Sequence, residues 1–189
     1  MKRILDSIKK DLEIYNYYSA LYVSLSLIDT CAKIEYNIPS IKNHDNKDSY
    51  VNRYVNWLNQ YYLPLYEKDI NNPMIPANAI YQYRCSVLHE STNYIDKNNR
   101  KKYNDIKDLY RIILTTDSSH RNKSAVSNGK ETIEEIQLNV KKFVEEIIYS
   151  ILKWMENKSD KDYELKFSIE TGSWSSTTLD GVTGFYNIT

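Results

Sequence analysis

Glycine is scarce in this sequence: only four of its 189 residues are glycine, and all four lie after residue 128. Loops that cradle the phosphates of a nucleotide need several glycines close together, directly after a strand. No such cluster occurs here, and the predicted elements do not alternate between strand and helix. These absences exclude a dinucleotide-binding fold.

Cysteine, net charge and long apolar runs are lacking as well. The two cysteines, Cys31 and Cys85, are too few for a metal cage, and their apolar neighbours are typical of buried thiols in a reducing compartment. The 25 basic and 25 acidic residues cancel, so no global charge attracts the chain to nucleic acid or to an anionic membrane. Neither a signal peptide nor a run of 18 apolar residues is evident. We therefore expect a cytoplasmic protein with no membrane contact, no metal and no cofactor.

Helical periodicity is present in four parts of the chain, three of which lie before residue 93. Apolar residues recur three or four positions apart over residues 4–32, as one long helix or two, and again over residues 50–65, where Pro64 lies near a helix end. Pro76 suits the first position of a further helix, which should end near Thr92.

A last amphipathic helix is the most clearly marked. Its apolar stripe begins at Val140 and continues to Trp154, and Asn139 is placed to cap its first turn.

Strand patterns occupy two shorter regions. The segments LYRIILTT (109–116) and TIEEIQLNV (132–140) are rich in β-branched residues and predict a hairpin or strand pair across the loop that separates them. Alternation over residues 163–170 and the turn sequence LDGV (179–182) predict a C-terminal β-hairpin.

These patterns together predict a mainly α (α+β) fold, in which a helical bundle carries a small accessory antiparallel β element and a C-terminal β-hairpin. We assign residues 1–158 to the bundle, with the strand pair inserted at about 108–139, and residues 159–189 to a C-terminal hairpin or tail.

Arg84 occupies an unexpected position within AIYQYRCSVLHEST, residues 79–92. At 100° per residue, the apolar side chains of this helix centre on the direction of Arg84 itself. A guanidinium keeps its charge, and leaving it in a low-dielectric place without a partner costs several kcal/mol. Either a carboxylate faces it, with Asp29, Glu35 and Glu90 as candidates, or Arg84 belongs to a functional site or an interface.

Arg84 and His89, separated by four residues, resemble the R-x(4–6)-H motif of the HEPN superfamily, the higher eukaryotes and prokaryotes nucleotide-binding domain. A helix reading Y-x-x-R-C-x-x-x-H before a strand pair and a final amphipathic helix is similar to a bacterial branch of that superfamily. The resemblance covers roughly residues 1–158 and implies a dimeric bundle that cleaves RNA without a metal at the dimer interface. At Cys85 the chain departs from many active members, which have Asn or another polar residue there.

The two residues suit cleavage of RNA by its own 2′-hydroxyl. His89, with an ordinary pKa of about 6.5, can act as the acid or the base, and the planar fork of Arg84 can bind two phosphate oxygens. Cys85, Ser86 and Glu90 are candidate supporting residues.

A regular α-helix, however, separates positions five apart by about 140°. Convergence of Arg84 and His89 therefore requires that the helix unwinds near His89, that the arginine bends across, or that a two-fold dimer joins one chain's arginine to the other's histidine.

Other charged residues support weaker hypotheses. Arg100, Lys101, Lys102, His120 and Arg121 form a candidate RNA-contact patch, for which the alternative is a solvated polar loop. Glu145 and Glu146 diverge by about 100° on a helix, so they need not share a proton or a metal, and we expect both to face solvent.

The sequence therefore predicts a metal-independent endoribonuclease of a toxin or defence type, acting as a homodimer, with an antitoxin or another protein as a partner. The alternative is a non-catalytic HEPN-like module that binds RNA, a nucleotide or a protein. In a third interpretation the dimer is structural, Arg84 forms only an ion pair, and His89 only caps the carbonyls at its helix end.

Overall fold

The structure is a computed structural model that describes residues 1–36, 47–70, 73–90, 109–127, 132–158, 173–179 and 182–188. In the last two ranges, and at some edges of the others, only the backbone is described; His89 and Glu90 are among these edge residues.

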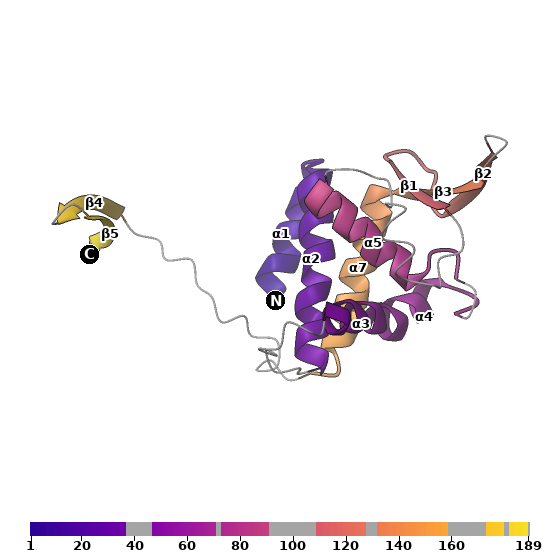
Figure 1. Cartoon of the computed structure of the whole chain (residues 1–189), viewed down its shortest axis with the longest axis horizontal. Coiled ribbons are helices and arrows are strands. Elements are labelled where there is room, and N and C mark those ends of the chain that lie inside the picture. Colours follow the sequence, from indigo (N-terminus) through magenta and orange to yellow (C-terminus); the bar gives the residue numbers. More distant parts are fainter. Residues whose placement is uncertain are drawn as a thin grey trace.

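The described helices form a bundle around one central helix, as Figure 1 shows. Helix α2 contacts α1, α3, α5 and α7. The bounds of the α-helices are α1 (Lys2–Glu13), α2 (Tyr17–Tyr36), α3 (Lys47–Trp57), α4 (Leu63–Tyr66), α5 (Ala77–Cys85) and α7 (Val140–Met155), and the two π-helical turns are η1 (Leu58–Tyr62) and η2 (Ser86–Glu90).

The apolar stretch over residues 4–32 forms two helices. Between α1 and α2 the backbone of Tyr15 has a φ of 61°, in the left-handed region, which ends the first helix. Asp11 then accepts a hydrogen bond from the hydroxyl of Ser19 at 2.6 Å across the break. This break lets α2 fold back against α1.

Large side chains from separate helices meet in one core. Trp57, Tyr62 and Trp154 are fully buried, and the rings of Trp57 and Trp154 lie edge to face with their centroids 6.4 Å apart. Cys31 is also fully buried, and burial raises the pKa of its thiol, as expected for an inert cysteine.

The π-helical turn η1 ends at Tyr62, two residues before Pro64, which lies near the end of the helix, as the sequence predicts. Proline has no N–H to continue an α-helical ladder, and a π turn accommodates the missing hydrogen bond. Tyr62, in this turn, and Tyr66, in α4, both donate hydrogen bonds to α7 from their hydroxyls.

A small mixed sheet extends from the bundle at the start of α7 (Figure 1). Its strands are β1 (Leu109–Thr115), β2 (Asn122–Ser127) and β3 (Thr132–Asn139), in the order β1-β3-β2. The mainly helical fold with a small β element is confirmed, and so is the predicted pairing of the first and last strands, but these two strands do not form an antiparallel hairpin. They pair in parallel, with Ile112 opposite Ile136, and the antiparallel pairing joins β2 to β3.

The cause of this difference is β2, which lies in the segment predicted to be a loop. Because β2 lies between β1 and β3 in the sequence, the chain reverses direction twice, and β3 runs parallel to β1. The sequence gives little warning of β2, because Asn122, Lys123, Ser124 and Ala125 are exposed and do not alternate between apolar and polar.

Strand β3 continues into α7 without a loop. Asn139 is the last residue of the strand and also the N-cap of the helix, where its side-chain oxygen accepts a hydrogen bond from the backbone N–H of Lys142 at 2.9 Å. The predicted cap and the predicted last helix are both confirmed.

The C-terminal hairpin is confirmed in its backbone. Strands β4 (Ser173–Leu179) and β5 (Val182–Ile188) pair antiparallel, with Leu179 opposite Val182 on either side of the predicted turn. The alternating segment 163–170 lies outside the described residues.

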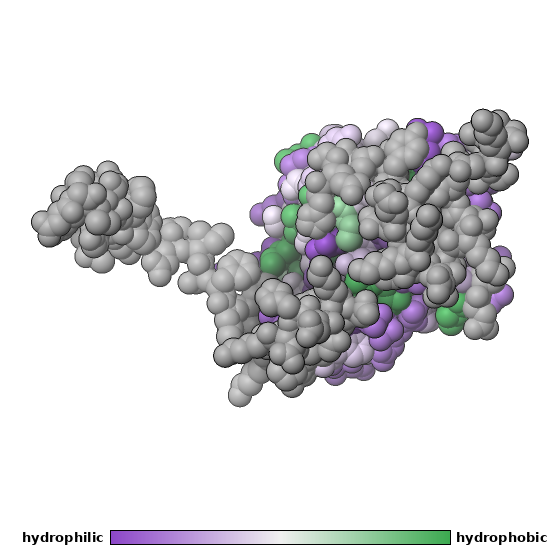
Figure 2. Space-filling view, in the orientation of Figure 1, coloured by the Kyte–Doolittle hydropathy of each residue, from purple (hydrophilic) through white to green (hydrophobic). Residues whose placement is uncertain are grey.

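The described surface mixes hydrophilic and hydrophobic residues, as Figure 2 shows for one face. Ile14, Tyr15 and Tyr18 are the most exposed large hydrophobic residues and lie together at the junction of α1 and α2. Among the described residues, no helix is long and apolar enough to cross a membrane.

Candidate functional site

Helix α5 holds Arg84 against a carboxylate of α2. Nη2 of Arg84 lies 2.6 Å from Oδ2 of Asp29, and the two side chains are 19% and 28% exposed. Nη1 of Arg84 also lies 3.9 Å from the sulfur of Cys85. Asp29 is therefore the carboxylate that the position of Arg84 required, and the remaining exposure leaves part of the pair open to solvent.

Glu35, another candidate partner, is engaged elsewhere. Its carboxylate accepts hydrogen bonds from Tyr61 and Trp154 and lies 2.8 Å from the ammonium of Lys158. It thereby ties the end of α2 to the end of α7.

Burial opposes the charge of both residues in the Arg84 pair, but the attraction between them outweighs burial for only one of the two. Burial raises the pKa of Asp29 above its usual value, and the attraction of Arg84 offsets this only in part. Burial also works against the charged form of Arg84, but there the attraction of Asp29 is stronger, so the pKa of Arg84 is raised. The arginine stays charged, and the aspartate is the member of the pair that takes a proton first.

The helix changes its winding between Arg84 and His89. Regular α-helix ends at Cys85, and the π-helical turn η2 covers Ser86–Glu90. In a π turn the hydrogen bonds span five residues rather than four. Ser86 and Val87 are buried in this turn and Cys85 is half-buried, whereas the side chains of His89 and Glu90 lie outside the described ones.

A second charged cluster lies where the loop after β1 meets α4 and α7. We call it the Arg121 network; its members are Tyr62, Glu67, His120, Arg121 and Glu146. The guanidinium of Arg121 donates to Glu67 at 2.6 Å, to the hydroxyl of Tyr62 at 2.9 Å, and twice to Glu146 at 2.9 and 3.1 Å. Its position is thus fixed from three elements.

Glu146 is the centre of this network. It also accepts hydrogen bonds from Nε2 of His120 at 3.0 Å and from the hydroxyl of Tyr62 at 2.7 Å. Burial disfavours its charge, but the hydrogen bonds from Arg121 and His120 outweigh burial and hold its pKa below the usual value. Because an ionised carboxylate only accepts, Nε2 of His120 must carry the proton in this contact.

The expectation that Glu145 and Glu146 both face solvent is wrong for Glu146, whose side chain is 13% exposed. The 100° between the two neighbours turns only Glu145 outward. The sequence holds a signal for this difference, since Glu146 follows the buried Phe143 by three positions and precedes the buried Ser150 by four.

Of the candidate RNA-contact residues, the structure describes His120 and Arg121, and both belong to the Arg121 network. His120 and Arg121 are only 13% and 15% exposed and are bonded to carboxylates. Arg100, Lys101 and Lys102 lie outside the described residues.

The described residues include no group of three histidine, cysteine, aspartate or glutamate side chains arranged to hold a metal ion. In the part of the chain that the structure describes, the Arg84 pair on α5 and the Arg121 network beside α7 are the candidate sites.

Comparison of the chain with protein-family models, with curated proteins and with solved structures finds no match in any of the three.

Proposed function

We propose that the protein is a metal-independent endoribonuclease of the HEPN type, in which Arg84 binds the scissile phosphate and His89 transfers the proton. One observation carries this proposal. A π-helical turn begins directly after the helix that holds Arg84, and it includes His89.

The π turn changes the angle between positions 84 and 89 around the helix axis. On a regular α-helix the two positions differ by about 140°. Because each π-helical turn contains more residues, five positions come closer to one complete turn, and the backbone of residue 89 rotates toward the side of Arg84. Single π-helical turns within helices are also frequent at functional sites.

The environment of Arg84 is compatible with phosphate binding. Asp29 keeps the guanidinium charged in a partly buried place, and the 19% exposure of the side chain gives a phosphate access to it. A phosphate would compete with Asp29, whose raised pKa makes it a weaker competitor than an ordinary aspartate. We further propose that the active form is a homodimer, as the resemblance implies.

The test is cleavage of labelled mixed-sequence RNA in EDTA by the wild type and by His89→Ala, with analysis of the product ends. We expect wild-type products with 2′,3′-cyclic phosphate ends and at least a 100-fold loss in the variant, since proton transfer contributes about 10²–10⁴-fold. His44→Ala, which removes the histidine of the polar segment KNHDNKD (42–48), is the matched control and should retain activity. Equal cleavage by His89→Ala and the wild type would refute the role of His89.

The ion pair itself favours a second candidate function, a module that binds RNA, a nucleotide or a protein without cutting. An arginine that already has a counter-ion can serve to hold α5 against α2. In that case no RNA is cleaved, and His89→Ala binds RNA as the wild type does in a gel-shift assay.

The dimer has a separate test in static light scattering at micromolar protein. A species of twice the 22.4 kDa chain mass is expected. A species of the chain mass alone contradicts the dimer.

A further inference from the structure

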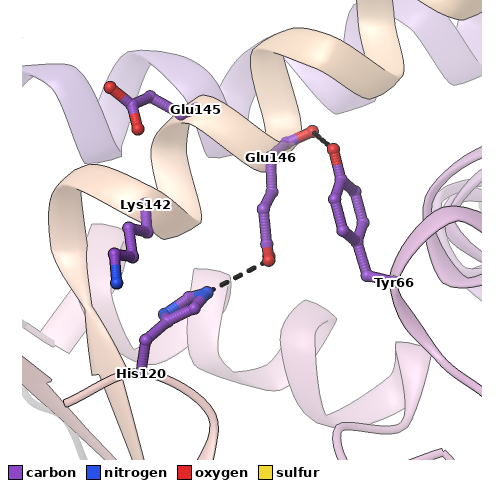
Figure 3. Close-up of a pocket in the computed structure, with 5 residues that line it drawn as sticks. All are labelled: Tyr66, His120, Lys142, Glu145 and Glu146. Carbon is purple, nitrogen blue, oxygen red and sulfur yellow. Dashed lines mark hydrogen bonds and ion pairs between the residues drawn. The ribbon is translucent and has the colours of Figure 1, made fainter. Parts of the chain in front are cut away.

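A cavity of about 320 Å³ opens beside the first turns of α7, next to the Arg121 network (Figure 3). Its lining residues are Tyr66, His120, Lys142, Glu145 and Glu146. The volume lies at the lower end of the range for small-molecule sites, which is about 300–1,000 Å³.

The inner wall of this cavity is rigid. Glu146 is bonded to Arg121, Tyr62 and His120, and the hydroxyl of Tyr66 donates to the backbone carbonyl of Glu146 at 3.1 Å. The charge of Glu146 is thereby compensated within the protein. His120 and Tyr66 complete this wall.

The outer wall carries two charges that no described residue compensates. In the described part of the chain, the ammonium of Lys142 and the carboxylate of Glu145 have no ion pair or hydrogen bond. They lie three positions apart on α7, where side chains are neighbours, and Figure 3 shows both on the same side of the helix. A ligand can satisfy both groups only if it offers an acceptor and a donor side by side.

This requirement excludes the simplest ligands. Glu145 would repel a lone anion and Lys142 a lone cation, and the cavity residues do not form a metal-binding group. A small neutral molecule with adjacent acceptor and donor edges satisfies both Lys142 and Glu145.

We propose that the cavity binds a guanine base. On guanine, N7 and O6 accept hydrogen bonds, and lysine binds this edge in protein–DNA complexes. The next edge carries the N1–H and N2 amine donors, which an unpaired base exposes and which suit a carboxylate such as Glu145. Adenine reverses the pattern, because it has a donor at N6 and an acceptor at N1.

The base can belong to a free guanine nucleotide or to single-stranded RNA, since the chemistry of recognition is shared. The site does not depend on the proposed nuclease activity, and binding is therefore tested with the full chain carrying His89→Ala, which cannot cleave by the proposed mechanism.

The first measurement is calorimetric titration of this protein with guanosine and adenosine 5′-monophosphates. We expect guanosine monophosphate to bind about ten- to a hundredfold more tightly, as for a two-hydrogen-bond contact to one base. Glu145→Gln should weaken the binding of guanosine monophosphate about tenfold or more while leaving the thermal unfolding curve unchanged, because the Glu145 carboxylate forms no hydrogen bond or ion pair with a described residue. Glu13→Gln, an exposed acid at the end of α1, is the matched control and should bind like the parent.

A second arm uses short single-stranded RNAs that contain either one guanine or none. Tighter binding of the guanine-containing RNA than of the mononucleotide, lost in Glu145→Gln, assigns the site to RNA. Binding of the mononucleotide alone assigns it to a free nucleotide. Equal binding of the two mononucleotides, no binding of either ligand type at millimolar concentration, or full binding by Glu145→Gln overturns the proposal.

Discussion

Arg84 and Arg121 are both arginines bonded to carboxylates, but they are placed by different means. Arg84 lies on a regular helix, and its partner Asp29 is 28% exposed. Arg121 has a φ of 56° in the left-handed region, contacts two carboxylates that are 7% and 13% exposed, and lies 5.6 Å and 5.9 Å from the ring centroids of Tyr66 and Tyr62. The helix dictates the first position, and the side-chain contacts dictate the second.

The two arginines therefore differ in how accessible they are: the counter-ion of Arg84 is partly exposed, whereas Arg121 links several elements in the interior. A phosphate can approach the partly open Arg84 pair, whereas Arg121 is enclosed by groups from three elements. The most charged cluster in the described part of the chain is thus structural at its centre, and we assign ligand binding only to its rim.

The largest expected effect is the loss of Arg121. Arg121→Met should lower the free energy of unfolding by about 3–5 kcal/mol, because Glu67 and Glu146 are then buried without their cation. Urea unfolding followed by circular dichroism at neutral pH measures this loss. Glu145→Gln, the exposed neighbour of Glu146, is the control and should change it by less than about 0.5 kcal/mol. A loss below about 1 kcal/mol for Arg121→Met would show that the network contributes little.

Arg84→Met should have a smaller effect, about 1–2 kcal/mol by the same measurement, since the pair is more exposed. Asp29 can also escape the loss of its partner by taking a proton, because its pKa is already raised. A destabilisation as large as that of Arg121→Met would mean that the two arginines have the same structural role.

The acid dependence of stability should differ in sign between the two carboxylates. The pKa of Glu146 lies below its usual 4.5 in the folded state, so its contribution is present above pH 4.5 and is lost as the pH falls through the lower folded value. The pKa of Asp29 lies above its usual 3.8, so its contribution is present below pH 3.8 and is lost as the pH rises through the folded value.

Unfolding free energies on both sides of pH 4.5 test these signs. As the pH is lowered, the free energy of unfolding should fall less steeply in Glu146→Gln than in the wild type. In Asp29→Asn it should fall more steeply. The same change of slope in both variants would contradict the assignment.

The smallest effect concerns the backbone. At position 121, Arg121→Gly should be more stable than Arg121→Ala by about 1 kcal/mol, because a Cβ atom is costly in the left-handed region. At position 84 the order should reverse, with alanine more stable by about 1 kcal/mol, since glycine is a poor helix former. Thermal unfolding of the four variants measures both differences. The same order of stability at the two positions would contradict the inference that residue 121 has a left-handed backbone and residue 84 a helical one.

Features with a local sequence pattern were predictable. The stripe of α7, its cap Asn139 and the hairpin around LDGV follow from spacings within a few residues, and all three are confirmed. The need for a partner at Arg84 also followed from the helix pattern, and Asp29 was one of three candidate partners.

Features that depend on distant residues were not predictable. Arg121 meets partners that are 54, 59 and 25 residues away, and no local pattern indicates those contacts. Strand β2 was missed because it pairs through its backbone while its described side chains face solvent. The Arg121 network and the mixed sheet are therefore products of tertiary structure.

Asn139 joins β3 directly to α7. Because the same residue ends β3 and caps α7, the two elements have no slack between them. One inserted residue there would rotate the buried stripe of α7 by about 100° relative to the sheet. We therefore expect β3 and α7 to unfold together, so that their amide protons exchange with solvent as one cooperative unit.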